Sequence, residues 1–192
     1  MTRHRPAPTE VATVSGVYVD ILSPDPASIN IEDIAHALAH QARFNGHLPQ
    51  FYSVAAHSVL VSHLIDPDLA LAGLLHDAAE AYLGDIVSPL KRLLPDYLEH
   101  ERVMMTAICK ALPVDPSTFA DSRVKAADLW ALALEQKHLS SVPADDWGLA
   151  DCLKFKLSEK NAWPTFDALH CTAPAASKDM FLARFAELTP QK

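Results

Sequence analysis

Glycine is scarce in this chain, and the residues that dominate it favour helices. Only 5 of the 192 residues are glycine, whereas 49% are hydrophobic, with alanine and leucine the most frequent. Sheet-rich and Rossmann-type folds use glycine in tight turns and at close backbone approaches. Alanine and leucine have high intrinsic helix propensities. The composition therefore favours an all-α protein.

Apolar residues recur at helical spacing in several segments. The predicted helices span residues 31–44, 54–65, 69–83, 95–112, 119–139, 151–160 and 177–188. Asn30 and Ser53 are the expected N-caps of the first two helices, and Gly84 is the expected end of the third. Residues 17–22 alternate between apolar and polar and predict a short strand. We predict an all-α bundle and leave open a short β-hairpin at its N-terminus.

Length and composition fit one domain without a membrane span. The longest apolar stretch, residues 69–75, is far shorter than the about 20 residues that a span needs. No apolar segment follows the basic N-terminal residues, so no secretory signal is expected. Three scattered cysteines are typical of reduced thiols in a cytoplasmic protein. We predict a single domain over residues 1–192, with its motif core at 31–139 and C-terminal helices from 140–192 packed on it.

The net charge and the histidine content indicate which classes of ligand the protein binds. A net charge of −8 does not indicate the excess of positive charge with which proteins bind the phosphates of duplex nucleic acid. It still permits a phosphorylated small molecule, because a bound divalent cation reverses the local field. The ten histidines are unusual, and histidine is the commonest metal ligand among side chains.

Four ionisable residues lie on apolar faces of three predicted helices. They are His57, the adjacent pair His76 and Asp77, and Asp128. A buried, unpaired carboxylate is costly, so each requires compensation. Two imidazoles and two carboxylates with open positions suit a catalytic transition metal better than a closed structural zinc site.

Each of these residues also has an ordinary structural role available. Asp128 can pair with Lys125 or Arg123, and Asp77 can pair with Lys91. A single inward histidine is usually a hydrogen-bonded core residue. Four such residues on three neighbouring helices favour the interpretation as metal ligands.

The order of these residues resembles the metal-binding motif of the HD phosphohydrolase superfamily. The string HDAAEAYLGD at 76–85, followed by PLK at 89–91, is similar to HD-type 5′-deoxynucleotidases. RFNGH at 43–47 and FYSVAAHSV at 51–59 resemble small phage-type enzymes that hydrolyse dATP. The resemblance covers about residues 21–139 and implies an HD-domain helical bundle.

The resemblance also implies roles for residues outside the metal motif. Glu80 matches an acidic residue of proton transfer, and Asp85 matches a second carboxylate near the scissile phosphate. Arg43 matches an arginine that contacts the nucleotide, and Lys91 matches a lysine placed for phosphate. These assignments make Glu80 and Asp85 the expected catalytic residues.

Two more residues complete the expected substrate site. Phe44 stands where the deoxynucleotidases have tryptophan, so discrimination between sugars is not predicted, and a core position is favoured for this phenylalanine over stacking on a base. His47 follows the Arg43 loop and can touch substrate. The expected substrate-binding residues are Arg43, Phe44, His47 and Lys91.

The expected function is metal-dependent hydrolysis of the 5′-phosphate ester of a (deoxy)nucleotide. The substrate is either a dNMP, releasing phosphate, or a dNTP, with dATP favoured, releasing triphosphate. One divalent transition metal is expected, with Co, Mn, Zn, Fe and Ni all open, and a second metal can arrive with substrate.

The alternative is a non-catalytic HD-like module that binds a nucleotide or a protein and uses its metal structurally. Cyclic dinucleotides and (p)ppGpp are disfavoured as substrates, because the motifs of those enzymes are absent. Apolar faces on the last two predicted helices favour a homo-oligomer.

Overall fold

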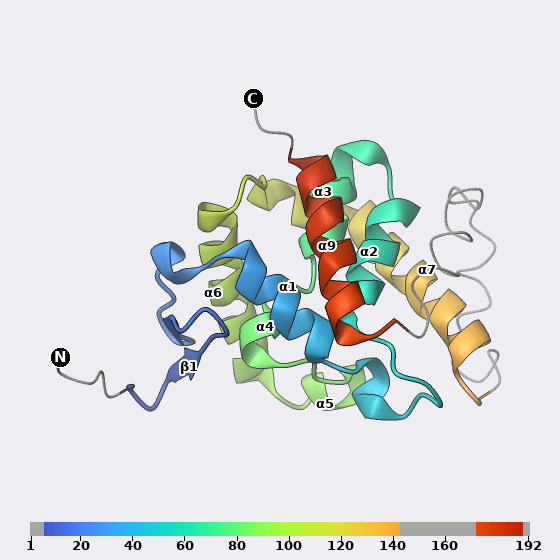
Figure 1. Cartoon of the computed structure of the whole chain (residues 1–192), viewed down its shortest axis with the longest axis horizontal. Coiled ribbons are helices and arrows are strands. Elements are labelled where there is room, and N and C mark those ends of the chain that lie inside the picture. Colours follow the sequence, from blue (N-terminus) through green and yellow to red (C-terminus); the bar gives the residue numbers. More distant parts are fainter. Residues whose placement is uncertain (1–5, 143–171, 190–192) are drawn as a thin grey trace.

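In the part of the chain that the structure describes, the regular elements are almost entirely helices (Figure 1). The computed structural model describes residues 6–142 and 172–189. Its helices are α1 (Ile31–His40), α2 (Val54–Leu64), α3 (Ala70–Leu75), α4 (Glu80–Leu83), α5 (Ser88–Lys91), α6 (Pro95–Ala111), α7 (Ser122–Leu139) and α9 (Pro174–Leu188). An antiparallel hairpin of β1 (Glu10–Ala12) and β2 (Tyr18–Asp20) precedes them. The predicted all-α class is confirmed, and the hairpin that was left open is present.

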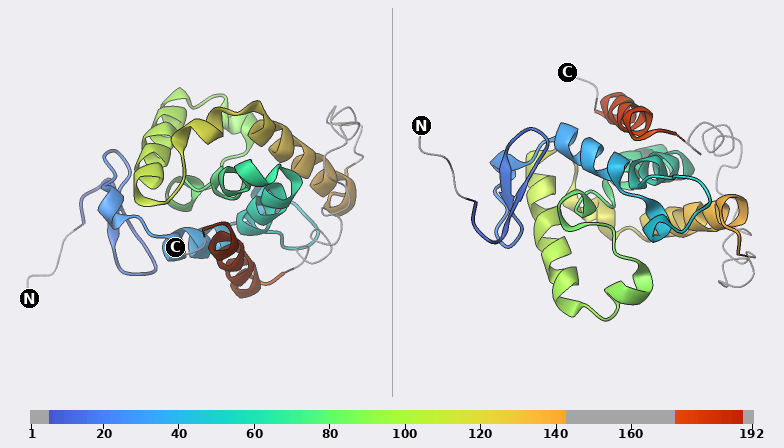
Figure 2. Two further views of the ribbon diagram at one scale, coloured as in Figure 1. Left: turned by 90° about the horizontal axis from the view of Figure 1, so that it is seen from above. Right: turned by 60° about the horizontal axis from the view of Figure 1, so that its bottom comes forward.

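Helix α2 forms the centre of the described bundle. Ten of its residues are buried, and it packs against α1, α3, α7 and α9 (Figures 1 and 2). Arg184 of α9 holds the C-terminal helix on α2, since its Nε and Nη2 donate to the hydroxyl and carbonyl oxygens of Ser62, each at 3.1 Å. None of the helices within residues 6–142 and 172–189 has the length and apolar character that crossing a membrane requires.

The prediction of a single helix over residues 69–83 is wrong, because the chain turns tightly between α3 and α4. The N–H groups of Ala78 and Glu80 donate to carbonyls three residues earlier, at 3.0 Å, which is tighter than the α-helical pattern. The His76 side chain contributes to this break. Its Nδ1 donates to the Gly73 carbonyl at 2.8 Å, which competes with the helical ladder. Gly84, with φ 84°, ends α4 as predicted.

The helix predicted to reach residue 44 ends at His40 instead. Asn30 caps its start as predicted, accepting from the Asp33 N–H at 2.8 Å. At the other end, residues 41–43 leave the helix and pair with residues 52–54. The backbone N–H of Arg43 donates to the Tyr52 carbonyl at 2.9 Å, and Ala42 and Ser53 form an isolated antiparallel β-bridge. We call this pairing the 41–54 ladder.

Other predicted ends shift by a few residues. The helix predicted from residue 119 begins at Ser122, because residues 116–120 form a 3-10 turn and Asp121 caps the helix by accepting from the Arg123 N–H. The C-terminal helix begins at Pro174 rather than residue 177. The helix predicted over 151–160 lies outside the described residues.

Candidate metal centre

Three elements bring their ionisable residues to one point. His57 lies in the first turn of α2, where Ser53 caps the helix by accepting from the Ala56 N–H at 3.1 Å. His76 lies in the tight turn after α3, and Asp128 lies on α7. One ligand atom from each of these three residues lies within 4.8 Å of the other two, so the cluster could hold a metal ion.

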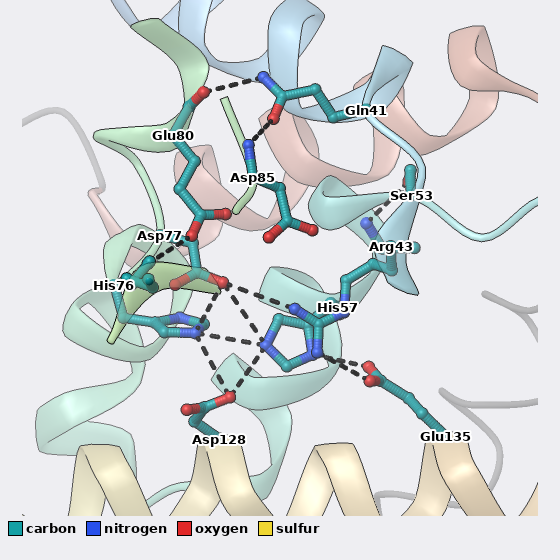
Figure 3. A network of polar contacts seen from close by, with 12 residues as sticks. Gln41, Arg43, Ser53, His57, His76, Asp77, Glu80, Asp85, Asp128 and Glu135 are labelled. Atoms are coloured by element: carbon teal, nitrogen blue, oxygen red, sulfur yellow. Dashed lines mark hydrogen bonds and ion pairs between the residues drawn. The ribbon is translucent and has the colours of Figure 1, made fainter. Parts of the chain in front are cut away.

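The distances within the cluster fit ligands of one small cation. His57 Nε2 lies 3.3 Å from both His76 Nε2 and Asp128 Oδ1. Asp77 Oδ2 lies 3.1 Å from His76 Nε2 and 3.7 Å from His57 Nε2, and His76 lies 3.9 Å from Asp128. Atoms bound about 2.1 Å from one ion, at angles of about 90–135°, lie about 3.0–3.9 Å apart. Figure 3 shows the four side chains pointing toward one another.

Second contacts orient both imidazole rings. The Nδ1 of His76 is occupied by the Gly73 carbonyl, and the Nδ1 of His57 lies 2.6 Å from Glu135 Oε1. Because both Nδ1 atoms are occupied, the two Nε2 atoms face the cluster. His57 is fully buried, whereas the Asp77 and Asp128 side chains are 20% and 19% exposed. The two carboxylates of the cluster therefore keep partial contact with solvent.

The 41–54 ladder places Arg43 beside the cluster. Its Nη1 lies 3.9 Å from Asp77 Oδ2, and its Nη2 donates to Glu135 Oε2 at 3.0 Å. The Phe44 ring lies against the Arg43 guanidinium, with 5.5 Å between Cζ and the ring centroid. His47 is exposed at the end of the following 3-10 turn. Of these candidates, Arg43 is the one brought next to the metal ligands.

Glu80 and Asp85 lie at the two ends of α4, on the other side of the cluster from Asp128 (Figure 3). The side-chain amide of Gln41 forms hydrogen bonds to the backbones of both residues. Gln41 Nε2 donates to the Glu80 carbonyl at 2.8 Å, and the Asp85 N–H donates to Gln41 Oε1 at 2.9 Å. Lys91 donates to Glu80 Oε1 at 3.2 Å and to Glu101 Oε1 at 2.8 Å.

Protons and cations compete for the cluster. Burial lowers the pKa of His76, but the negative charge of Asp77 and its hydrogen bond outweigh burial and raise that pKa to about 9. Burial raises the pKa values of Asp77 and Asp128, yet the imidazoles beside them hold both values well below the usual range. The cluster without an ion is therefore a set of imidazolium and carboxylate groups.

The carboxyl group of Glu80 lies in the opposite environment. Burial, together with the negative charges of Asp77 and Asp85, raises its pKa to about 9. Its Oε2 is buried without a hydrogen-bond partner. Burial also raises the pKa of Asp85. Glu80 thus holds a proton near neutral pH beside the carboxylates of Asp77 and Asp85.

The alternative ion pairs weighed from the sequence are realised only in part. Asp128 does pair with Lys125, at 2.6 Å, but through Oδ2, while its Oδ1 faces His57. The ion-pair partner of Asp77 is Arg43 rather than Lys91. Pairing with Lys125 therefore does not remove Asp128 from the cluster.

Sequence reasoning missed two residues of the site. Glu135 follows Asp128 by seven residues, which is about two helical turns on the same face. A second acidic residue on the buried stripe of that helix was the signal that could have found it. Gln41 gave no such signal, because its position depends on where α1 ends.

The comparisons with known proteins place the chain beside uncharacterized relatives. No protein-family model matches it. It is 38% identical over 139 residues to an uncharacterized protein of Rhodobacter capsulatus, a match that covers 66% of this chain and 71% of that protein. It is 36% identical over 189 residues to the uncharacterized protein YfdR of Escherichia coli (strain K12), with 93% of this chain and 95% of YfdR covered. The chain therefore belongs to the same family as YfdR.

Proposed function

We propose that the protein is a metal-dependent phosphohydrolase of the HD type that cleaves the 5′-phosphate ester of a (deoxy)nucleotide. The observation that carries the proposal is the convergence of His57, His76 and Asp128 on one point, with Asp77 beside them and both carboxylates partly exposed to solvent. Two imidazoles and two carboxylates suit a divalent first-row metal such as Mn, Fe, Co, Ni or Zn. When bound, such an ion acidifies a water molecule and polarises a phosphate group.

The residues around the cluster supply the remaining chemistry. Arg43 offers positive charge beside Asp77, where it can neutralise phosphate oxygens as charge shifts in the transition state. Glu80 retains a proton because of its raised pKa, and we assign it as the donor to the leaving 5′-oxygen. Asp85 is assigned to orient the attacking water. Lys91, paired with Glu80, stays the candidate for further phosphate charge.

Two classes of substrate are compatible with the proposed cleavage of the 5′-phosphate ester. A dNMP would release phosphate, and a dNTP, with dATP first, would release triphosphate. The protein is stripped with a chelator, reloaded with Mn²⁺ or Co²⁺, and incubated with each dNMP and dNTP. Ion chromatography then distinguishes phosphate, pyrophosphate and triphosphate among the products. Release of pyrophosphate would contradict cleavage at the 5′-ester.

Ligand variants connect turnover to the cluster. His76→Ala and Asp77→Ala should each lower turnover by more than the about 10–100-fold typical of substitutions at residues that hydrogen-bond metal ligands. Asp179→Ala, which removes an exposed carboxylate on α9, is the control and should leave turnover unchanged. Absence of turnover with every metal, in a protein that binds the ion tightly, would favour a non-catalytic module with a structural metal.

A further inference from the structure

Glu135 contacts two different parts of the site with its two oxygens. It lies on α7 and is fully buried. Oε1 accepts from His57 Nδ1 at 2.6 Å, and Oε2 accepts from Arg43 Nη2 at 3.0 Å (Figure 3). A single buried carboxylate therefore joins the central metal ligand to the cation beside the cluster.

The first contact decides which nitrogen of His57 faces the cluster. A carboxylate only accepts hydrogen bonds, so Nδ1 must carry the proton that it donates. A cation that displaces the proton of Nε2 then finds its lone pair directed at the position shared with His76 and Asp128, each 3.3 Å away. An acidic partner of this kind fixes the tautomer and ring orientation of a metal-binding histidine and strengthens it as a ligand.

The second contact decides where the Arg43 guanidinium points. With Nη2 held by Glu135, Nη1 is directed at Asp77, 3.9 Å away. The backbone of Arg43 is fixed independently by the 41–54 ladder. Guanidinium groups bind carboxylates and phosphates through a rigid fork of donors. Holding one arm on Glu135 leaves the other arm directed at Asp77, whose side chain is partly exposed to solvent.

We propose that Glu135 is a positioning residue that sets the affinity for the metal ion and the placement of the phosphate-binding arginine together. The metal part needs only the cluster. The arginine part rests on the proposed function, since it takes the ligand of Arg43 to be a nucleotide phosphate. Loss of Glu135 should therefore weaken ion binding and substrate binding separately.

Glu135→Gln tests the metal part. Glutamine offers one acceptor oxygen to two donors, so either His57 or Arg43 faces an NH₂ group. Zn²⁺ affinity, measured by competition with a chromophoric chelator, should fall about 10–100-fold. Glu99→Gln is the matched control, because Glu99 pairs with Arg102 on the exposed face of α6. Equal zinc affinity in wild type and Glu135→Gln would overturn the proposal and leave the proposed function standing.

A measurement on the wild-type protein covers the case in which Glu135→Gln does not fold. In the Zn²⁺-loaded protein, long-range ¹H–¹⁵N spectra should show His57 protonated at Nδ1 and ligating through Nε2. Ligation through Nδ1 would overturn the proposal. A wild-type protein that binds no Zn²⁺, Mn²⁺ or Co²⁺ would instead overturn the proposed function itself.

Kinetics at saturating metal test the arginine part. Once the ion site is filled, Glu135→Gln should still raise KM for the nucleotide by about 10-fold or more, because Arg43 is no longer held. A purely structural loss would reduce the fraction of active protein and leave KM unchanged. An unchanged KM at full metal loading would restrict Glu135 to the ion site and overturn the coupling.

Discussion

Two buried glutamates near the cluster are held in opposite protonation states by their neighbours. Burial favours the protonated form of both. At Glu135, the cations Arg43 and His57 outweigh burial and lower the pKa. At Glu80, the nearby carboxylates add to burial and raise the pKa to about 9. The same residue type thus provides an ionised hydrogen-bond acceptor on one side of the cluster and a protonated carboxyl group on the other.

The raised pKa of Glu80 predicts how stability depends on pH in the ion-free protein. The ordinary pKa of this group is 4.5, whereas the folded value is about 9. Between these values the folded state binds more protons than the unfolded state, so its stability falls as pH rises. Glu80→Gln removes this term and should flatten the decline in Tm between pH 5 and pH 6.5.

That window lies below the ordinary pKa of 6.5 of His76, whose folded value is about 9, so His76 contributes little to the slope until the pH nears 6.5. The control is Glu101→Gln, which removes the other carboxylate partner of Lys91 and should keep the wild-type slope. The measurement is thermal unfolding by circular dichroism in chelator-treated buffer. Identical slopes in wild type and Glu80→Gln would contradict the assigned pKa.

At the level of elements, the turn between α3 and α4 positions several residues of the site. It presents His76 and Asp77 to the cluster, and α4 then carries the chain from Glu80 to Gly84. Gly84 has φ 84°, and its carbonyl accepts from the Tyr97 hydroxyl at 2.7 Å. A side chain at this φ is strained, which explains why glycine stands directly before Asp85.

Gly84→Ala should therefore cost both stability and activity. The backbone strain is about 1–2 kcal/mol, or about 2–4 °C in Tm per kcal/mol for a chain of this size. Displacement of Asp85 should lower turnover by up to about 100-fold. Gly16→Ala is the matched control, because Gly16 has φ 83° in the hairpin turn. It should lose similar stability and keep its turnover, and equal turnover in both variants would contradict the role of Gly84.

The sequence predicted which segments are helical better than it predicted where the chain bends. The caps Asn30 and Ser53 were predictable, because a side-chain acceptor before an apolar run has a local cause. The break after α3 was not, since it depends on His76 bonding Gly73 within a Leu- and Ala-rich helical pattern. The ligand residues could be predicted from polar groups on apolar faces, whereas Glu135 and Gln41 act through contacts distant in sequence.

In the whole molecule, the cluster joins α2, the α3–α4 turn and α7 at one point. An ion bound there connects segments from different parts of the chain, so its binding adds to the stability of the folded state. At a Zn²⁺ concentration of about 100 times Kd the gain is about 2.7 kcal/mol. For a chain of this size that corresponds to a rise in Tm of about 5–10 °C.

Differential scanning fluorimetry with and without Zn²⁺ measures this rise. Asp128→Asn should reduce it strongly, because one charged ligand of the cluster is lost. Asp179→Asn, on the exposed face of α9, should respond as the wild type does. Equal shifts in all three proteins would show that zinc binds somewhere other than the cluster.

The assembly state stays a prediction, but its basis in the sequence changes. Phe181 of α9 is buried in the core of the monomer, and the helix predicted over 151–160 lies outside the described residues. Four leucines at the corner of α5 and α6 are exposed, namely Leu90, Leu93, Leu94 and Leu98. Exposed apolar residues that are close together are typical of contact surfaces. We expect light scattering to give a mass above that of the 21.0 kDa monomer, and a monomer at micromolar concentration would contradict the expected homo-oligomer.

The 41–54 ladder has a consequence for how this family can diversify. Because residues 41–43 are tied to 52–54 by backbone hydrogen bonds, the spacing between Arg43 and His57 does not depend on the residues that connect them. Residues 44–51 form the loop that the 41–54 ladder closes. This loop begins with two residues whose backbone is left-handed, Phe44 and Asn45. Under the proposed function, insertions or exchanges there would change the nucleoside that is accommodated while Arg43 and the cluster keep their geometry. Substrate selectivity and phosphate chemistry would then evolve at separate rates.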